Sequence, residues 1–466
     1  MSGVAGRAVT PGAETERPSE PRFAGRPAWI LVTVALITAM LGKLAIVGDD
    51  ARWLAALGHI VVRDHAVPTG VPFAAASTAH WPNTLVLAEL IFYWLERAIG
   101  DQGLLVAQTV AVAAALTILA WGARASGAST PGVCQSLLLV VLGALTSFTI
   151  ARVQMFSLIL FPLLLVLLRA DQRQPSRRIW LALPLLAVWA NLHGTALAGL
   201  AILYLYLSFS LVREKPIRAG GLAVMSLVAM CATPAGVRSL DYYYGLTTNL
   251  AARRGVGLWA PLGTGPLDLL LILAGVWMGV RAWRAARPPL WELVAVVILA
   301  ALTVRAERNG VWLLFLLAAP AAHASRGRRN WTGLIPLAAA AAVALLVADV
   351  VDWAGSDGSA PVAIQRAVQI ADGSPILADS QPAEEVALAG GRIWAGNPID
   401  AFSKRVQATY LDFIVGGAGG RAALDLAQIK VVVVGAGDSA DRLVSRDRAF
   451  RKAEVVGNTD IYVRRG

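Results

Sequence analysis

A succession of long apolar runs is the feature of this sequence that most constrains its fold. A membrane-spanning helix needs about 20 mostly apolar residues. The chain is 57% hydrophobic and only 15% charged, which is more apolar side chain than a soluble interior of this size can hide. We therefore predict an α-helical polytopic membrane protein with about eleven transmembrane helices. The runs lie at about 27–47, 104–121, 133–150, 155–168, 179–192, 194–212, 221–236, 266–283, 289–304, 310–324 and 331–350.

Basic residues fall in the short loops between these runs. The net charge of +11 could indicate a nucleic-acid partner, but loop arginines are typical of cytoplasmic loops in membrane proteins. Inside and outside loops alternate without a break if the run at 84–98 is a helix on the outer surface. We expect a multi-pass protein of the cell (inner or plasma) membrane, with a cytoplasmic N-terminus and no nucleic-acid partner. The marking residues are Arg124, Arg169, Arg173, Arg177, Arg178, Arg213, Lys215, Arg218, Arg281, Arg284, Arg287, Arg326, Arg328 and Arg329.

The segments outside the runs divide the chain into three parts. Residues 1–26 are polar and rich in Pro, Gly, Glu and Arg, which predicts a disordered cytoplasmic tail. Residues 27–351 form the transmembrane domain, with a long outer loop at 48–103. Residues 352–466 are predicted to be a small extracytoplasmic α/β domain, with strands at 375–379, 392–395, 429–434 and 460–463. The glycine-rich stretch at 434–440 is interpreted as a strand-to-helix turn, because no suitable acidic residue comes after it for a dinucleotide ribose.

Paired acidic residues at the exit of the first run are the sharpest chemical feature. Ionisable groups at membrane depth are costly and tend to mark a functional site. Asp49 or Asp50 could act as a general base that takes a proton from an acceptor. The pair could instead hold a divalent cation such as Mg²⁺ or Mn²⁺. One of the two could also cap the next helix.

Other polar residues at the predicted outer helix ends complete the candidate site. Arg152, Arg305 and Arg308 lie where cations are disfavoured, and a guanidinium suits phosphate recognition. Pairing with Glu307 or with lipid headgroups is the alternative. Asn191 and His193 could bind a phosphate or a sugar, or could simply form a polar turn. Further pocket candidates are His59, His80, Glu89 and Asp241.

Taken together, these residues resemble the GT-C superfamily of membrane glycosyltransferases, in its bacterial branch that uses polyprenyl-phosphate sugars. The matching features are Asp49-Asp50 after the first span, a long outer loop, and the surface helix with its aromatic core at 90–95. The stretches 189–194 and 305–309 match as well. The resemblance covers most of the chain, although its motifs are short. The Lys-Pro-Pro stretch of the aminoarabinose and mannosyl transferases is missing from the outer loop, so the resemblance specifies neither sugar nor acceptor.

The resemblance implies an inverting transfer of a sugar from a polyprenyl-phosphate donor, with Asp50 or Asp49 as the base. The arginines would hold the donor phosphate, and the lipid-linked sugar would be the co-substrate. The acceptor would be a cell-envelope glycan, lipid, protein or secreted small molecule. A transporter or flippase for lipid-linked saccharides is the first alternative, although its polar mid-membrane residues are missing. A non-catalytic cell-envelope scaffold is the second, and an O-antigen-type ligase or polymerase, which would carry its large loop late in the chain, is the third.

Overall fold

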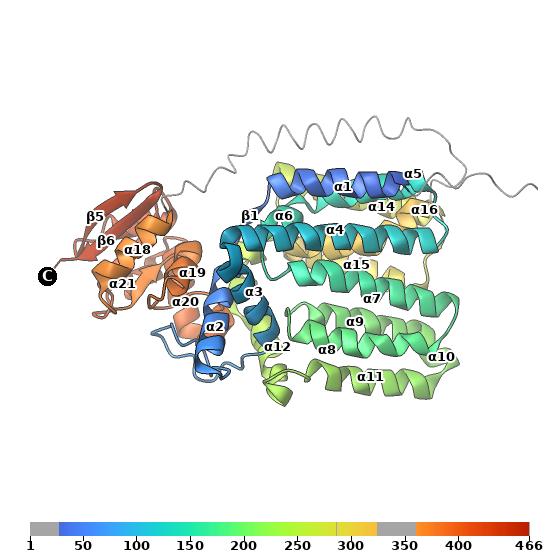
Figure 1. Cartoon of the computed structure of the whole chain (residues 1–466), viewed down its shortest axis with the longest axis horizontal. Helices are drawn as coiled ribbons and strands as arrows, with labels where there is room; N and C mark the ends of the chain where they lie inside the picture. The colour runs from blue at the N-terminus through green and yellow to red at the C-terminus, as the bar shows by residue number, and fades with distance from the viewer. Residues whose placement is uncertain (1–27, 286, 324–359, 466) are drawn as a thin grey trace, which may run out of the picture.

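The computed structural model describes residues 28–285, 287–323 and 360–465. The predicted tail at 1–26 and the predicted run at 331–350 lie outside these residues. Each of the ten earlier runs overlaps a helix of the bundle, and Figure 1 shows these helices side by side with nearly parallel axes. They are α1 (Ala28–Lys43), α4 (Asp101–Ala125), α5 (Thr130–Gly143), α7 (Met155–Arg173), α8 (Ala182–Ala190), α9 (Ala196–Tyr206), α11 (Pro216–Met230), α14 (Pro266–Ala285), α15 (Leu290–Arg305) and α16 (Gly310–His323).

Four described helices are long and apolar enough to cross a membrane. They are α4, α7, α14 and the continuous segment Ala196–Glu214, which joins α9 to α10 (Val212–Glu214). Half or more of the best window in Ala196–Glu214 and in α14 is not buried inside the protein, as expected for helices that face lipid. The count of eleven spans stays a prediction.

Two cavities identify which helix ends lie together. One cavity is lined by Asp49, which follows α1, and by Val153, which precedes α7. His193, which follows α8, and Arg308, which follows α15, line the same cavity. The other gathers the opposite ends, including Ser126 after α4, Arg173 of α7 and His323 of α16. Successive helices therefore alternate in direction. We call the first end, which faces the C-terminal domain, the domain end, and the other the far end.

Shorter elements cross the domain end of the bundle instead of running along it (Figure 1). Helix α2 packs closely on α3 because residue 58 is glycine: a Cβ at Gly58 would lie 2.1 Å from the carbonyl oxygen of Glu89. The other elements here are α12 and α13, together with a two-stranded parallel ladder of β1 and β2. Their bounds are α2 (Ala51–Asp64), α3 (Val86–Ile99), α6 (Leu145–Thr149), α12 (Ser239–Thr248), α13 (Leu250–Arg254), β1 (Ile46–Val47) and β2 (Ile150–Ala151).

The C-terminal part forms a small α/β domain around a four-stranded sheet in the order β3-β4-β6-β5. Strands β3 and β4 are parallel, and β6 is antiparallel to both β4 and β5. Three of the four predicted strands match β3, β4 and β6, whereas 392–395 contributes only isolated bridges through Ile393. The bounds are α18 (Ala360–Ala371), β3 (Ile376–Ala378), α19 (Ser380–Leu388), α20 (Lys404–Ile414), α21 (Arg421–Leu424), β4 (Val431–Gly435), α22 (Ser439–Val444), β5 (Phe450–Val456) and β6 (Thr459–Arg464).

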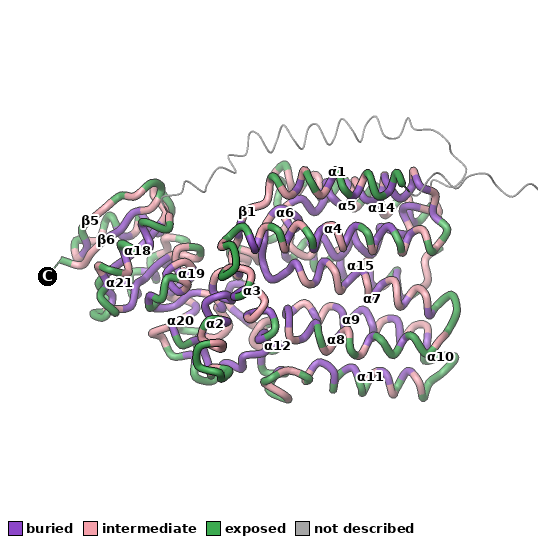
Figure 2. Tube along the Cα trace, viewed as in Figure 1, coloured by how far each residue is buried: buried purple, intermediate pink, exposed green. Residues whose placement is uncertain are grey.

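The C-terminal domain docks on the loop that comes after α1. Ile393 and Trp394 exchange backbone hydrogen bonds with the segment at 73–76. Helix α19 packs on α2, where Arg52 forms an ion pair with Glu385 at 3.5 Å. Figure 2 shows buried chain running through this junction, between the bundle and the sheet. The loop at 48–103 and the C-terminal domain therefore form one continuous wall over the domain end.

Candidate functional site

The ladder of β1 and β2 sets the position of the acidic pair. Ile46 and Val47 pair with Ile150 and Ala151, and the N–H of Gly48 donates to the Ala151 carbonyl at 3.0 Å. A side chain at Gly48 would clash, because its Cβ would lie 2.1 Å from the Ile150 side chain. The ladder therefore places the acidic pair, which comes after β1, beside the arginine that comes after β2.

Asp50 has an unusual backbone that the C-terminal domain holds in place. Its φ of 78° lies in the left-handed region, which is unfavourable for a residue with a side chain. The N–H of Asp50 donates to Oε1 of Glu384 at 2.9 Å, and the same oxygen accepts from Asn397 Nδ2 at 2.7 Å. Asp50 precedes α2 but its carboxylate does not cap the helix. Instead, Oδ1 of Asp50 accepts the indole N–H of Trp53 at 3.2 Å.

Asp49 lies in an acidic and enclosed environment. Burial, followed by the charge of Asp50, raises the pKa of Asp49 from 3.8 to about 6, against the opposing effects of Arg152 and Arg52. Burial, followed by Asp49 and Asp50, also raises the pKa of Glu384 well above its usual value. Burial and neighbouring negative charge therefore both favour the protonated forms of Asp49 and Glu384.

Two arginines supply positive charge beside the acidic pair. Arg152 is only 4% exposed, and its Nε has no hydrogen-bond partner among the described residues. Burial lowers the pKa of Arg152 to about 10, so the side chain is still a cation at neutral pH. Arg308 is partly buried with its guanidinium 5.1 Å from the ring centre of Trp259. Burial also lowers the pKa of Arg308, and the negative charge of Asp50 acts in the opposite direction.

These groups meet at a cavity of about 400 Å³ between the bundle and the C-terminal domain. Asp49, Asp50, His193 and Arg308 line it, so four of the predicted site residues come together. Arg152 lies behind the lining, where its charge acts on Asp49. The cavity thus places carboxylates and guanidinium groups around one enclosed space.

His193 is held by a cluster of hydroxyl groups. Its Nδ1 lies 2.7 Å from Ser157 Oγ and 2.8 Å from Thr195 Oγ1, and Trp189 Nε1 donates to Ser157 Oγ at 2.8 Å. Burial, followed by the nearby arginines, lowers the pKa of His193 well below its usual value. His193 is therefore a neutral ring at physiological pH, fixed in orientation at the cavity wall.

The other predicted site residues lie outside the cavity lining. Asn191 donates to two backbone carbonyls, and Arg305 donates to the carbonyls of Ala252 and Arg253. Both side chains are therefore used to hold loops. Glu89 is fully buried and accepts from Asn83 at 3.0 Å. The three remaining candidates have exposed side chains, namely His59, His80 and Asp241.

Four polar residues of the C-terminal domain that lie at the cavity or support it were not among the predicted ones. Asn397, Asp400 and Tyr410 line the cavity, and Glu384 holds Asp50 from behind. No local pattern marks them, because they are isolated polar residues in an ordinary α/β domain. The only available signal was the prediction that this domain and the acidic pair lie on the same side of the membrane.

The predicted metal site is not supported by a suitable set of donors. In the described part of the chain, no group of three or more His, Cys, Asp or Glu side chains is arranged to hold a metal ion. A divalent cation at Asp49 and Asp50 therefore stays a prediction from the sequence alone.

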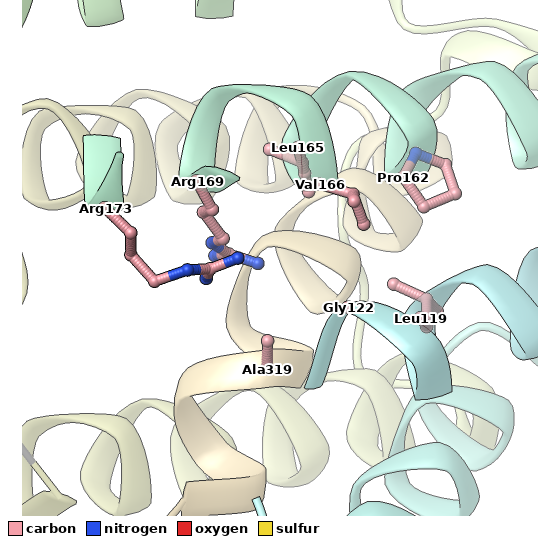
Figure 3. A pocket seen from close by; sticks show the side chains of 8 residues that line it. All are labelled: Leu119, Gly122, Pro162, Leu165, Val166, Arg169, Arg173 and Ala319. Atoms are coloured by element: carbon pink, nitrogen blue, oxygen red, sulfur yellow. The ribbon is translucent and has the colours of Figure 1, made fainter. Parts of the chain in front are cut away.

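The far end of the bundle has a second cavity, which is rich in arginine. A cavity of about 280 Å³ there is lined by Arg169, Arg173 and Arg287. A smaller cleft adjoins it, where Arg169 and Arg173 point their side chains into the space between α7 and Ala319 (Figure 3). Arg169 is already paired with Glu292 at 2.8 Å. Glu292 is the one acidic side chain among the described residues that line this cavity.

Comparison with known proteins supports the architecture. No protein-family model and no curated protein sequence matches the chain. Its fold is that of solved GT-C glycosyltransferases. ArnT from Cupriavidus metallidurans, solved with undecaprenyl phosphate bound, matches with a TM-score of 0.57 at 13% identity, over 94% of this chain and 98% of ArnT. The same enzyme in its apo state matches with a TM-score of 0.57 at 14% identity, over 93% of this chain and 97% of ArnT.

The arabinofuranosyltransferase AftD from mycobacteria shares the fold as well. It matches over 94% of this chain with a TM-score of 0.54 and 14% identity. The chain spans only 41% of AftD, so AftD is a much longer protein. The resemblance seen in the sequence is thus confirmed at the level of the fold.

Proposed function

We propose that this chain is an inverting glycosyltransferase that moves a sugar from a polyprenyl-phosphate donor to an acceptor at the outer face of the cell membrane. The main support is the cavity lined by Asp49, Asp50 and Arg308, with the charge of Arg152 acting on Asp49 from behind the lining. Such a transfer needs a base for the acceptor and positive charge for a phosphate leaving group. The fold agrees, since ArnT shares it and was solved with undecaprenyl phosphate.

Asp50 is the proposed base. Trp53 fixes its carboxylate and Glu384 fixes its main chain, so the base is held in one geometry before a substrate binds. Its charge acts on three residues that line the cavity, namely Arg308, Tyr242 and Asp400. Asp49 is the alternative base, because a pKa of about 6 suits proton transfer near neutral pH.

The reaction follows from these positions. The acceptor hydroxyl gives its proton to Asp50 while its oxygen attacks the anomeric carbon from the face opposite the phosphate. The bond between that carbon and the phosphate oxygen breaks, and its electron pair leaves with the polyprenyl phosphate. Arg308 and Arg152 stabilise this charge, and His193 offers its Nε2 side to the same phosphate. The product carries the sugar with inverted configuration.

Transfer assays with the purified full chain test this proposal. Polyprenyl-phosphate pentoses and hexoses would serve as donors, and Asp50→Asn and Asp49→Asn would be compared with the wild type. Loss of a general base reduces turnover about 10²- to 10⁴-fold, so one of the two variants should fall by that factor. Asp241→Asn, a change at an exposed position outside the cavity, is the matched control. Full turnover in both cavity variants would remove the base assignment. No turnover by the wild type with any of these donors would instead favour a non-catalytic scaffold.

The orientation of the chain has its own test. Ser445 is exposed on the C-terminal domain, so a cysteine there should react with a membrane-impermeant maleimide in intact cells. The two native cysteines, Cys134 and Cys231, would first be replaced by alanine. Labelling that requires permeabilised cells would place the cavity on the cytoplasmic side and contradict the outer-face proposal.

A further inference from the structure

A row of aromatic rings presents two carboxylates to the same cavity. Trp53 and Trp81 meet edge-on at 6.4 Å between ring centres, and Trp81 meets Tyr242 at 6.5 Å. Each indole holds one carboxylate. Trp53 Nε1 donates to Asp50 Oδ1 at 3.2 Å, and Trp81 Nε1 donates to Asp400 Oδ2 at 2.9 Å. All five residues line the cavity, so Asp400 of the C-terminal domain repeats the arrangement of the proposed base.

A buried hydroxyl in the same wall has no partner. Tyr410 on α20 is only 3% exposed and lines the cavity, yet its hydroxyl makes no hydrogen bond within the described part of the chain. Buried polar groups in folded proteins are almost always paired. An unpaired hydroxyl at a cavity wall therefore points to a ligand that supplies the missing partner.

The charges along this wall restrict the chemistry of that ligand. Asp49, Asp50 and Asp400 all line the cavity, and like charges brought together oppose binding. A phosphate or carboxylate on the acceptor would be repelled here. Sugar hydroxyls suit the wall instead, because a carboxylate accepts from them and a tyrosine hydroxyl can donate to them or accept from them. Trp81 and Tyr242 also line the cavity, and apolar ring surface suits the C–H groups of a sugar ring.

We propose that Asp400 and Tyr410 form the acceptor subsite of this cavity, and that the acceptor group it binds is a neutral sugar. This inference rests on the proposed glycosyltransferase function. It assigns the C-terminal domain a direct part in acceptor binding: the acceptor hydroxyl that reacts lies at Asp50, and its neighbouring hydroxyls lie on Asp400 and Tyr410.

Two conservative variants test the subsite. Asp400→Asn removes only the charge, and Tyr410→Phe removes only the hydroxyl. Hydrogen bonds to charged groups contribute more than neutral ones, so the acceptor KM should rise about 10- to 100-fold in Asp400→Asn and about 3- to 10-fold in Tyr410→Phe. The donor KM should stay within about twofold in both. Asp425→Asn changes an exposed carboxylate of the same domain and is the control that should behave like the wild type.

Binding measurements separate this inference from the proposed function. Saturation-transfer NMR on the full chain in nanodiscs would use methyl glucoside and methyl mannoside, each as the neutral glycoside and as its 6-phosphate. Neutral glycosides should bind more tightly, and both cavity variants should weaken them. Equal or tighter binding of the 6-phosphates, binding unchanged in both variants, or no binding of any glycoside would overturn the subsite. Binding at Asp400 and Tyr410 without sugar transfer from any polyprenyl-phosphate donor would sink the proposed function and leave the subsite standing.

Discussion

Replacing Asp49 by asparagine should make the protein more stable at neutral pH. Burial and the neighbouring Asp50 raise the pKa of Asp49 from 3.8 to about 6, so the folded chain binds this proton more tightly than the unfolded chain does. Ionising the carboxyl group therefore costs stability as the pH rises from about 4 to 6, and the full cost persists above that range. One pKa unit corresponds to about 1.4 kcal/mol, which gives at most about 3 kcal/mol at pH 8. Asparagine has nearly the same shape and avoids this cost.

Thermal unfolding of the purified protein at pH 4.5 and pH 8 measures the effect. At pH 8, Asp49→Asn should unfold several degrees above the wild type. At pH 4.5 the gap should shrink, because Asp49 is then protonated in the folded wild type. Asp241→Asn, at an exposed position, should change stability by no more than about 0.5 kcal/mol at either pH. No gain for Asp49→Asn at pH 8, or an equal gain at both pH values, would refute the argument that Asp49 is strained by its surroundings.

Three further substitutions probe separate parts of the site. Glu384→Gln should keep turnover within about threefold, because Oε1 still accepts from the N–H of Asp50. Glu384→Leu removes this acceptor, so it should destabilise the fold by about 1–3 kcal/mol and impair turnover. Equal behaviour of the two variants would contradict the positioning role of Glu384. Arg308→Lys keeps the charge but loses the planar fork, so the KM for the polyprenyl-phosphate donor should rise about tenfold with less effect on the acceptor. Arg305→Gln should leave turnover within about twofold, since Arg305 binds backbone carbonyls outside the cavity; a large rise in donor KM would return it to the donor site. Steady-state kinetics and thermal unfolding read out all three.

The sequence predicts the membrane part well because the bilayer imposes a simple rule. A helix that crosses it must be apolar over most of its length, and the runs that lie within α4, α7 and α14 satisfy this in sequence alone. Alternating helix direction then sends Asp49, His193 and Arg308 to the same end without any knowledge of packing. That is why these three meet at one cavity.

The missing part of the site depends on tertiary docking, which leaves no local pattern. Glu384 reaches Asp50 from 334 positions further along the chain, and Asp400 reaches Trp81 from 319 positions away. Arg305 shows the converse case. Arg305 ends α15 and lies only three residues before Arg308 in the sequence. Its side chain, however, donates to the backbone carbonyls of Ala252 and Arg253 instead of lining the cavity.

Strand β5 (Phe450–Val456) was not predicted, and its composition explains why. Arg451, Lys452 and Glu454 interrupt the apolar pattern, and the strand lies at the edge of the sheet. Charged residues on an edge strand prevent pairing with other chains. Because of these charged residues, the strand lacks the hydrophobic alternation on which a strand prediction from the sequence depends.

The most direct test of the central claim is a structure of the full chain with a polyprenyl-phosphate sugar bound. We expect the phosphate to contact Arg308 at the domain end, with the anomeric carbon turned toward Asp50 and the lipid tail leaving between helices of the bundle. A phosphate bound instead at the far end, beside Arg169 and Arg173, with no sugar near Asp50, would contradict the account.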